Sequence, residues 1–412
     1  MALKRVLSLV LVFASLSVAR AADSDSLSRN PAYNAIRPRF QPLALQLSRI
    51  PAEEPHFGHN LTLFHNGQDK AARLLADLGA AQASIHLSYY HLNNGPFGTT
   101  VRDLLTRKAA EGVRVQLIFE NQSNCVPARF FTPLREAGAD VAYFTPLSRP
   151  GRFLRHMNHR NHQKVVVIDN KIAYMGGMNL TDKYLSDWED THLRVEGPAA
   201  AAMDAPFQDI WKDLRKGFVP SVSIPEASEG EIILQTIGDR ALDYQHPLEE
   251  ALVWALDNAE DYFYALTPYF APTLALMDAL QRAAADGKDV RIILPAFSDY
   301  TVMGACHRLY YRRCAKAGIR LYAVPGRFNH GKLFVTDDYL SSTGSMNLDA
   351  RSLIRNYENN TFIYHTETAG QIRSYLEDTM SSAKEIDPDR LPKLNLYRKL
   401  LVVFAWLISA HL

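Results

Sequence analysis

A histidine, a lysine and an aspartate recur at a fixed spacing around a short apolar run in this 412-residue chain. From the histidine, lysine lies at +2, aspartate at +7, glycine at +14, asparagine at +17 and an acid at +28. A module duplicated for structural reasons alone would keep its apolar and glycine positions, but it has no reason to keep His, Lys and Asn, so the repeat indicates shared chemistry. The first copy is His162, Lys164, Asp169, Gly176, Asn179 and Asp190; the second is His330, Lys332, Asp337, Gly344, Asn347 and Glu358.

Each copy is expected to bring its polar groups to one surface. Alternate side chains on a strand share a face, so each histidine points the same way as the lysine two residues later. The small residues at 176–177 and 344–345 permit a turn that returns Asn179 and Asn347 to the same place. Each half therefore offers an imidazole, an ammonium and a carboxamide together.

This combination of groups fits phosphate chemistry. Lysine supplies a point charge, and asparagine supplies an amide donor, for oxygens that gain charge in a transition state. The chain has no glycine-rich phosphate loop. No further cluster of His or Cys completes a metal site, and an ammonium beside an imidazole repels cations. We therefore expect a reaction without metal or cofactor in which a histidine is the nucleophile.

The elements that must position these residues also occur in duplicate. In each half, an apolar strand precedes a helix with a glycine stop, a second strand, a second helical stretch, a third strand and then the motif strand. This alternation predicts a duplicated α/β fold with mixed sheets flanked by helices. The matching segments are 83–92 with 261–270, 104–119 with 279–294, and 135–144 with 315–324.

The repeat also sets the expected domain boundaries. We place the first unit at 56–218 and the second at 228–386. Residues 219–227 fall in a stretch rich in Pro, Ser and acidic residues, which is typical of a linker. Residues 22–55 carry several prolines and are expected to be irregular.

Both ends of the chain are apolar. Residues 1–21 have two basic residues, an apolar run and a small-residue motif, which predicts a signal peptide or, alternatively, an uncleaved membrane anchor. The body is then exported and lies on the periplasmic side, associated with the membrane, or is secreted. The tail at 387–412 contains an uncharged run too short to span a bilayer, so it predicts either a helix in the membrane interface or a helix docked on the protein's own core.

Composition excludes some classes of protein. A net charge of +1 argues against binding nucleic acid through bulk charge. The three cysteines, Cys125, Cys306 and Cys314, are too few and too scattered for a disulfide framework or a zinc site, so we interpret them as structural thiols.

The duplicated motif resembles that of the phospholipase D superfamily. Two surrounding stretches, "RNHQKVVVIDNKIAYMGGMNLTDKYL" (160–185) and "GSMNLDARSLIRNYENNTFIY" (344–364), resemble bacterial cardiolipin synthases of that superfamily. One departure is Ser345, which stands where the first copy has a second glycine. The resemblance implies two halves related by a pseudo-twofold axis, with one active site between them.

The resemblance also implies a role for each motif residue. His162 would attack phosphorus to give a phosphohistidine, and His330 would protonate the leaving oxygen. An acceptor hydroxyl, or water, would then discharge the intermediate. Phosphoryl oxygens would be held by Lys164, Lys332, Asn179 and Asn347.

The acidic residues of the motif have two expected roles. Asp190 and Glu358 would each accept a hydrogen bond from the histidine of their own half and so set its tautomer. Asp169 and Asp337 belong to the catalytic motif and are candidate catalytic residues, but their place at the ends of strands favours a structural role.

Four functions compete for this motif. Phosphatidyl transfer would join a phospholipid to phosphatidylglycerol, giving cardiolipin and releasing glycerol or another headgroup alcohol. Hydrolysis would give phosphatidic acid from the same intermediate. An exported nuclease is the third reading, since residues 149–164 are basic, but they lack base-stacking aromatics. A lipid-binding protein without activity has no support, because both His-Lys pairs are present. The expected partners are therefore phospholipids and a membrane surface, with neither metal nor obligatory nucleic acid.

Overall fold

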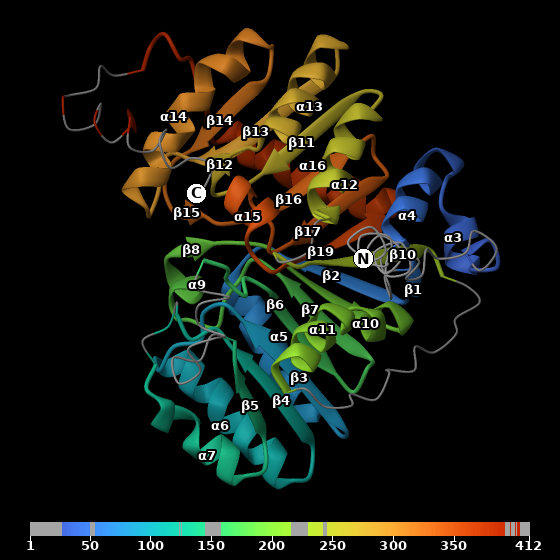
Figure 1. Ribbon diagram of the computed structural model, residues 1–412, viewed down its shortest axis with the longest axis vertical. Coiled ribbons are helices and arrows are strands. Elements are labelled where there is room, and N and C mark those ends of the chain that lie inside the picture. The colour runs from blue at the N-terminus through green and yellow to red at the C-terminus, as the bar shows by residue number, and fades with distance from the viewer. Residues whose placement is uncertain are drawn as a thin grey trace, which may run out of the picture.

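The computed structural model describes residues 27–49, 54–122, 124, 126–144, 158–215, 230–241, 245–391, 396, 400 and 402–403. The predicted signal peptide at 1–21, the linker at 219–227, Cys125 and most of the apolar tail lie outside these residues. Two halves are stacked along the long axis of the molecule, each built on its own sheet (Figure 1). Within the described residues, no helix combines the length and the apolar character needed to cross a bilayer.

The first half is built on a seven-stranded mixed sheet of order β2-β9-β7-β6-β3-β4-β5. Three of its strands, β3, β4 and β5, run parallel to one another, and the motif strand β6 is antiparallel to β3. The carboxyl ends of the parallel strands therefore lie at the same edge as the start of the motif strand. The strands are β2 (Asn60–Phe64), β3 (Ser84–Tyr89), β4 (Arg114–Phe119), β5 (Asp140–Tyr143), β6 (Lys164–Ile168), β7 (Ile172–Gly176) and β9 (His192–Glu196).

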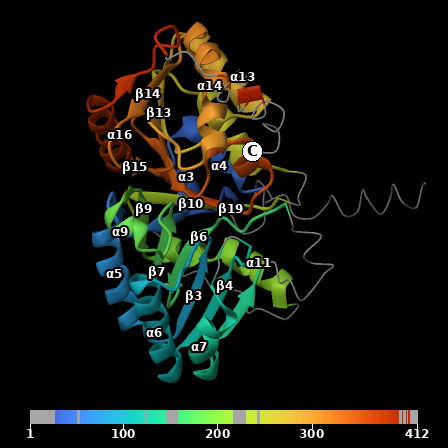
Figure 2. The same cartoon turned by 90° about the vertical axis from the view of Figure 1, so that its left-hand side faces the viewer.

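Helices cover both faces of this sheet (Figure 2). Helices α5, α6 and α7 pack on one face through residues such as Leu74, Leu105 and Leu134, and α10 and α11 pack on the other through residues such as Phe207. The helical elements are α5 (Gly67–Ala80), α6 (Pro96–Ala110), η2 (Ala128–Phe131), α7 (Thr132–Glu136), α9 (Lys183–Ser186), α10 (Pro198–Ala202) and α11 (Ala205–Arg215).

The second half repeats this plan on a nine-stranded sheet of order β1-β10-β19-β17-β16-β11-β13-β14-β20. Strands β11, β13 and β14 are parallel, and the second motif strand β16 is antiparallel to β11. The strands are β1 (His56–Gly58), β10 (Ile232–Asp239), β11 (Tyr262–Leu266), β13 (Asp289–Pro295), β14 (Arg320–Val324), β16 (Leu333–Thr336), β17 (Leu340–Gly344), β19 (Glu358–Tyr364) and β20 (Lys384–Glu385).

Helices again cover both faces of the sheet (Figure 1). Helices α12 and α13 contribute Leu252 and Leu280 to the larger core, and α16 contributes Leu376 to the core on the opposite face. The helices are α12 (Pro247–Asp257), α13 (Leu274–Ala285), α14 (Thr301–Lys316), α15 (Ala350–Ile354) and α16 (Thr366–Ser381). The predicted duplicated α/β fold with mixed sheets is confirmed.

The segment predicted to be irregular, 22–55, instead contains helical turns: α3 (Pro31–Ala35), η1 (Pro38–Phe40) and α4 (Gln41–Leu47). Each begins with a proline at its first or second position, where a missing N–H costs nothing. The prolines therefore start helices here rather than break them. Phe40 and Leu43 enter the core of the second half, and β1, which the sequence places in the first unit, pairs with β10 of the second sheet.

The halves meet along paired backbone segments and a shared core. Strand β8 (Trp188–Glu189) of the first half pairs in parallel with β15 (Phe328–Asn329) of the second. In a second backbone contact between the halves, Asn161 forms a parallel bridge with Tyr357. A short pair, β12 (Phe270–Ala271) with β18 (Leu348–Asp349), lies within the second half. Side chains of both halves, including Val165 and Ile363, form one apolar cluster.

Candidate active site

A cavity of about 670 Å³ lies at the junction and is lined by residues of both halves. Both motif histidines and both motif asparagines line it: His162 and Asn179 from the first half, His330 and Asn347 from the second. The carboxyl ends of the parallel strands face this junction, which is where ligands bind in open α/β sheets. Four of the ten sequence-predicted residues are thus brought to one cavity wall.

Each histidine is held by the acid of the opposite half. His162 Nδ1 lies 2.8 Å from Glu358 Oε2, and His330 Nδ1 lies 2.7 Å from Asp190 Oδ2. The expectation that each acid serves the histidine of its own half is therefore wrong. With Nδ1 committed to a carboxylate, Nε2 is the nitrogen left for chemistry on each ring.

Backbone contacts across the junction explain this exchange of acids. The His162 amide donates to the Tyr357 carbonyl at 2.9 Å, and the His330 amide donates to the Glu189 carbonyl at 2.7 Å. Tyr357 and Glu189 each precede the acid of the opposite half. The docking of the halves therefore sets the pairing, which the spacing within either half does not encode.

The Glu358 carboxylate is surrounded by donors. Ser345 Oγ lies 2.5 Å and Ser352 Oγ 2.6 Å from its oxygens, and Asn356 Nδ2 lies 3.1 Å away. Burial favours the neutral acid, but His162, Lys164 and Ser345 outweigh it and hold the pKa of Glu358 below its ordinary value. The departure from glycine at Ser345 thus adds a donor to this acid.

The Asp190 carboxylate has fewer donors. Besides His330, it accepts a hydrogen bond from the Thr191 backbone amide at 2.7 Å. A Cβ atom added at Gly177 would lie 2.1 Å from Asp190 Oδ1, so this position, which corresponds to Ser345, has no room for a side chain. Burial raises the pKa of Asp190 to about 7, against the opposing effect of Lys332. The two histidine–acid pairs therefore differ in where they hold a proton.

Burial also lowers the pKa of both histidines. For His162, the attraction of Glu358 opposes this effect, and the positive charge of Lys164 reinforces it. For His330, Lys332 and Lys164 add to the effect of burial. Both rings are consequently neutral at physiological pH when no substrate is present.

The motif lysines lie directly behind the histidines. Lys164 Nζ donates to the His162 carbonyl at 2.6 Å, and Lys332 Nζ donates to the His330 carbonyl and lies 2.9 Å from His330 Nδ1. Both side chains are buried. Burial lowers the pKa of Lys164 to about 7 and that of Lys332 to about 8. Their charge is thus available to an anion at the histidines but is lost at a lower pH than usual.

The two asparagines are held differently. Asn179 Oδ1 accepts the backbone N–H of His91 at 3.0 Å, and its Nδ2 donates to the Tyr184 hydroxyl at 2.8 Å. Asn347 Oδ1 is buried and finds no hydrogen-bond partner among the described residues. The first carboxamide is fixed by the protein, and the second keeps bonding capacity at the cavity.

Asp169 and Asp337 lie away from the cavity, at hairpin turns after the motif strands. Both have positive φ, 53° and 51°. Asp169 accepts the backbone amides of residues 82–84 at 2.7–2.8 Å. Asp337 accepts those of residues 260–262 at 2.8–3.3 Å. Each carboxylate thus ties a turn to the start of the neighbouring strand, which argues against the catalytic role.

Several residues at this site were not predicted from the sequence. Asn161 and Asn329 precede the two histidines, and this repeat at position −1 was a usable signal. Asn161 Nδ2 donates to Ser88 Oγ at 2.8 Å, and Asn329 Oδ1 accepts the Gly331 amide at 3.0 Å. The aromatic rings around His330 and the cations that also line the cavity do not recur as the same residues at matching positions of the two halves, so the repeat could not identify them. These residues are Tyr184, Trp188, Tyr269, Phe328, Arg160 and Arg351.

A metal ion is held in a protein by several ligating side chains that lie close together. Across the part of the chain that the structure describes, no group of three or more His, Cys, Asp or Glu side chains is arranged to hold a metal ion. The groups at the cavity instead suit nucleophilic and general acid–base chemistry on a bound anion.

Comparisons with known proteins agree on one family. A family model for the PLD-like domain of cardiolipin synthase matches residues 74–211 and 252–380. Cardiolipin synthase 1 of Bacillus anthracis is 31% identical over 364 residues, 84% of this chain and 71% of the relative. The major cardiolipin synthase of Bacillus subtilis is 33% identical over 338 residues, 79% of this chain and 70% of the relative.

Solved structures show the same fold at low identity. Phosphatidylserine synthase from Haemophilus influenzae matches with a TM-score of 0.69 at 14% identity, covering 87% of this chain and 97% of that chain. Polyphosphate kinase from Porphyromonas gingivalis matches with a TM-score of 0.58 at 14% identity, covering 85% of this chain and 53% of that chain. At these identities the likeness concerns the fold alone.

Proposed function

Because this chain belongs to the cardiolipin synthase family with PLD-like domains, we propose that it transfers a phosphatidyl group from a phospholipid to phosphatidylglycerol and so makes cardiolipin. The observation that carries this proposal is the pairing of His162 and His330 in one cavity, each held at Nδ1 by a carboxylate of the opposite half. Such a pair supplies a nucleophile and a general acid on either side of one phosphorus.

In the first step, His162 Nε2 forms a bond to phosphorus, and the bond from phosphorus to the headgroup oxygen breaks. The proton that this oxygen needs comes from the His330–Asp190 pair. The acids support this division of roles. Glu358 stays ionised and steadies the positive charge that grows on His162, whereas Asp190 has its pKa raised to about 7 and can hold a proton.

In the second step, the acceptor hydroxyl gives its proton to the His330–Asp190 pair, and its oxygen attacks phosphorus. The bond from phosphorus to His162 breaks and returns a neutral imidazole. Water in place of the lipid hydroxyl would give phosphatidic acid from the same intermediate. The charges of Lys164 and Lys332 and the amides of Asn179 and Asn347 support the extra negative charge on the phosphoryl oxygens.

A lipid substrate requires the cavity mouth to meet a bilayer, and we propose that the protein acts at a membrane surface. Phe297 and Tyr300 stand on the loop before α14 with 52% and 56% of their surface exposed, and Ile354 of α15 is 37% exposed. Tyr300 also lines the cavity. Location on an exported or periplasmic side of that membrane is proposed from residues 1–21 alone.

The decisive experiment incubates the purified protein with phosphatidylglycerol vesicles and separates the products. Cardiolipin with glycerol supports transfer, phosphatidic acid with glycerol would replace it by hydrolysis, and no turnover would contradict both. After brief incubation with labelled lipid and a quench in alkaline detergent, which preserves the acid-labile bond between phosphorus and histidine, wild type should carry the label. His162→Ala should not carry it, whereas the exposed-histidine control His59→Ala should.

A further inference from the structure

The two halves place different chemistry at corresponding loops beside the cavity. In the repeat, His91 after β3 corresponds to Tyr269 after β11, and Asn124 after β4 corresponds to Asp299 after β13. His91 Nδ1 lies 3.3 Å from Asn124 Oδ1. The Tyr269 hydroxyl donates to Asp299 Oδ1 at 2.9 Å. The same contact between two loops thus involves the neutral amide of Asn124 in the first half and the carboxylate of Asp299 in the second.

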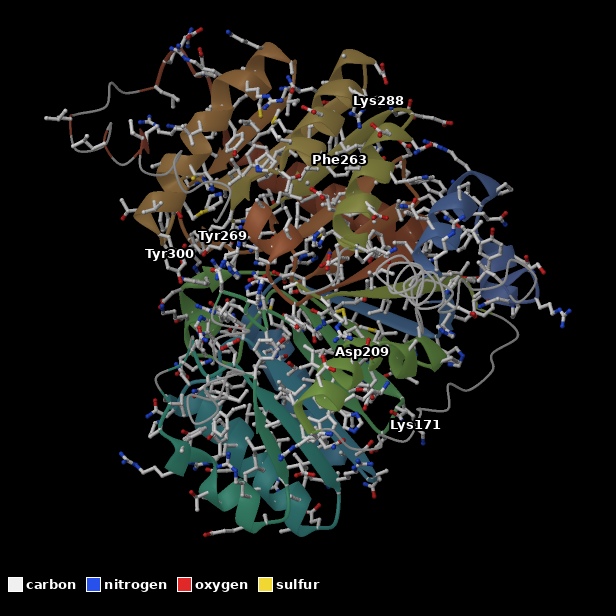
Figure 3. All side chains as sticks on the ribbon, in the orientation of Figure 1. Lys171, Asp209, Phe263, Tyr269, Lys288 and Tyr300 are labelled. Carbon is white, nitrogen blue, oxygen red and sulfur yellow. The ribbon has the colours of Figure 1, made fainter. Side chains whose placement is uncertain are left out.

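Aromatic rings line the same cavity beside His330 and beside Tyr269, the hydrogen-bond partner of this carboxylate. The rings of Trp188 and Tyr269 lie 5.1 Å and 6.1 Å from the His330 ring, and the ring of Tyr300 lies 6.0 Å from that of Tyr269. Figure 3 shows Tyr269 and Tyr300 together at the boundary between the two halves. We call the space bounded by Trp188, Tyr269, Asp299 and Tyr300 the alcohol compartment.

Two aspartates among the described residues line the cavity, and Asp299 is the one that is open to a ligand. The other aspartate that lines the cavity, Asp349, is buried and accepts the Ser352 backbone amide at 2.7 Å as the cap of α15. Asp299 is exposed and accepts its hydrogen bond from the Tyr269 hydroxyl. A carboxylate has lone pairs for further donors, so this one can accept from a bound molecule as well.

The geometry of phosphoryl transfer decides what reaches this compartment. Attacking and leaving groups lie roughly in line through phosphorus, so the headgroup oxygen leaves on the side opposite His162, beside its proton donor His330. The accepting hydroxyl reverses that step and must enter at the same place. The leaving alcohol and the accepting alcohol therefore occupy one compartment in turn.

We propose that the alcohol compartment selects the headgroup, with Asp299 accepting a hydrogen bond from a donor group on the carbon next to the one that bears the reacting oxygen. The second hydroxyl of a glycerol headgroup and the ammonium of an ethanolamine headgroup share this chemistry. Alcohols without such a donor, and anionic headgroups, are disfavoured. The proposal rests on the proposed function, and it adds that one residue sets the preference for both donor and acceptor.

The test compares two lipids that differ only in these hydroxyls. Phosphatidylglycerol and phosphatidylpropanol, in otherwise identical vesicles, compete as donors, and free glycerol and 1-propanol compete as acceptors. Wild type should favour the glycerol partner in both competitions. Asp299→Asn should reduce both preferences by the same factor, about tenfold, because a charged acceptor is lost while the shape is kept. Asp257→Asn, an exposed aspartate paired with Arg282, is the matched control.

Each outcome has a defined meaning. An equal fall in turnover for all substrates in Asp299→Asn would mean that the hydrogen bond to Tyr269 merely ties two loops together, and it would overturn the proposal. A wild type that shows no preference for glycerol would overturn it as well. A change confined to donors would refute the shared compartment. In a third arm, the rate of headgroup release from phosphatidylethanolamine should fall further in Asp299→Asn than the rate from phosphatidylglycerol if the ammonium is the natural hydrogen-bond donor. Absence of any headgroup release from wild type would instead refute the proposed function.

Discussion

Glu358 and Asp190 sit at equivalent places in the two halves, but their surroundings give them different charges. Two hydroxyls and an amide donate to Glu358, whereas among the described residues Asp190 has one backbone donor besides its histidine. A carboxylate with several donors stays ionised, and a buried one with few donors binds a proton more readily. Pairs of titratable groups with separated pKa values are how one site provides both a base and an acid near neutral pH.

The two pairs predict a bell-shaped dependence of kcat/KM on pH, because this quantity reports the pKa values of the free enzyme. On the acid side, protonation of His162 removes the nucleophile, and its lowered pKa places this limb below the usual range of histidine. On the basic side, the His330–Asp190 pair loses its proton near the Asp190 pKa of about 7, and Lys164 and Lys332 lose their charge at about 7 and 8. Activity should therefore fall as pH rises through this range.

Asp190→Asn tests the assignment of the basic limb. Without the carboxylate, the proton must reside on His330 alone, whose pKa is held well below its ordinary value by burial. The basic limb should move to lower pH, as measured by kcat/KM between about pH 4 and pH 9. An unchanged limb in this variant, or a shift of the same size in the control Asp257→Asn, would rule out the His330–Asp190 pair as the proton donor.

The motif strands carry chemistry at one end and a structural carboxylate at the other. Asp169 follows β6 in a left-handed turn with φ 53°, a conformation that Asp tolerates better than most residues. Its oxygens accept the amides of residues 82–84, which start β3. The aspartate of the motif therefore sets the register between the motif strand and its neighbour.

Asp169→Ala should lower the free energy of unfolding by about 2–4 kcal/mol, because three backbone amides lose a charged acceptor and alanine is strained at positive φ. Turnover per folded molecule should stay within about twofold of wild type. Denaturant unfolding gives the first quantity, and activity normalised to the folded fraction gives the second. Asp169→Asn, which tolerates the turn, should lose less stability. A large fall in turnover with unchanged stability would make Asp169 a reactant.

Repetition in the sequence made most of these elements predictable. The spacing of the motif identified both histidines, and the alternation of strands and helices predicted two mixed sheets. The pairing of His162 with Glu358 was not predictable, because it arises where two units dock and neither unit encodes it alone. The helices that begin near Pro31 and Pro42 were not predicted, because several prolines in one stretch favour irregular structure, although the first turn of a helix accepts a proline.

At the scale of the whole molecule, the halves are not separable units that happen to touch. Strand β1 precedes the first sheet in sequence but pairs with β10 of the second, and Phe40 of η1 enters the core of the second half. Val165 and Ile363 belong to one apolar cluster that crosses the junction. Separating the halves would expose this cluster, at a cost of about 25 cal/mol for each Å² of apolar surface.

One chain should therefore build one complete site, and two damaged chains should not repair each other. A mixture of His162→Ala with His330→Ala should remain as inactive as either variant alone. Product formation from phosphatidylglycerol measures this, with the two variants mixed both after purification and by co-expression. In each variant the apolar cluster between the two halves stays intact, so the halves should not exchange between chains. Recovery of a sizeable fraction of wild-type turnover in the mixture would mean that halves exchange between chains, and the junction described here would then form between two molecules.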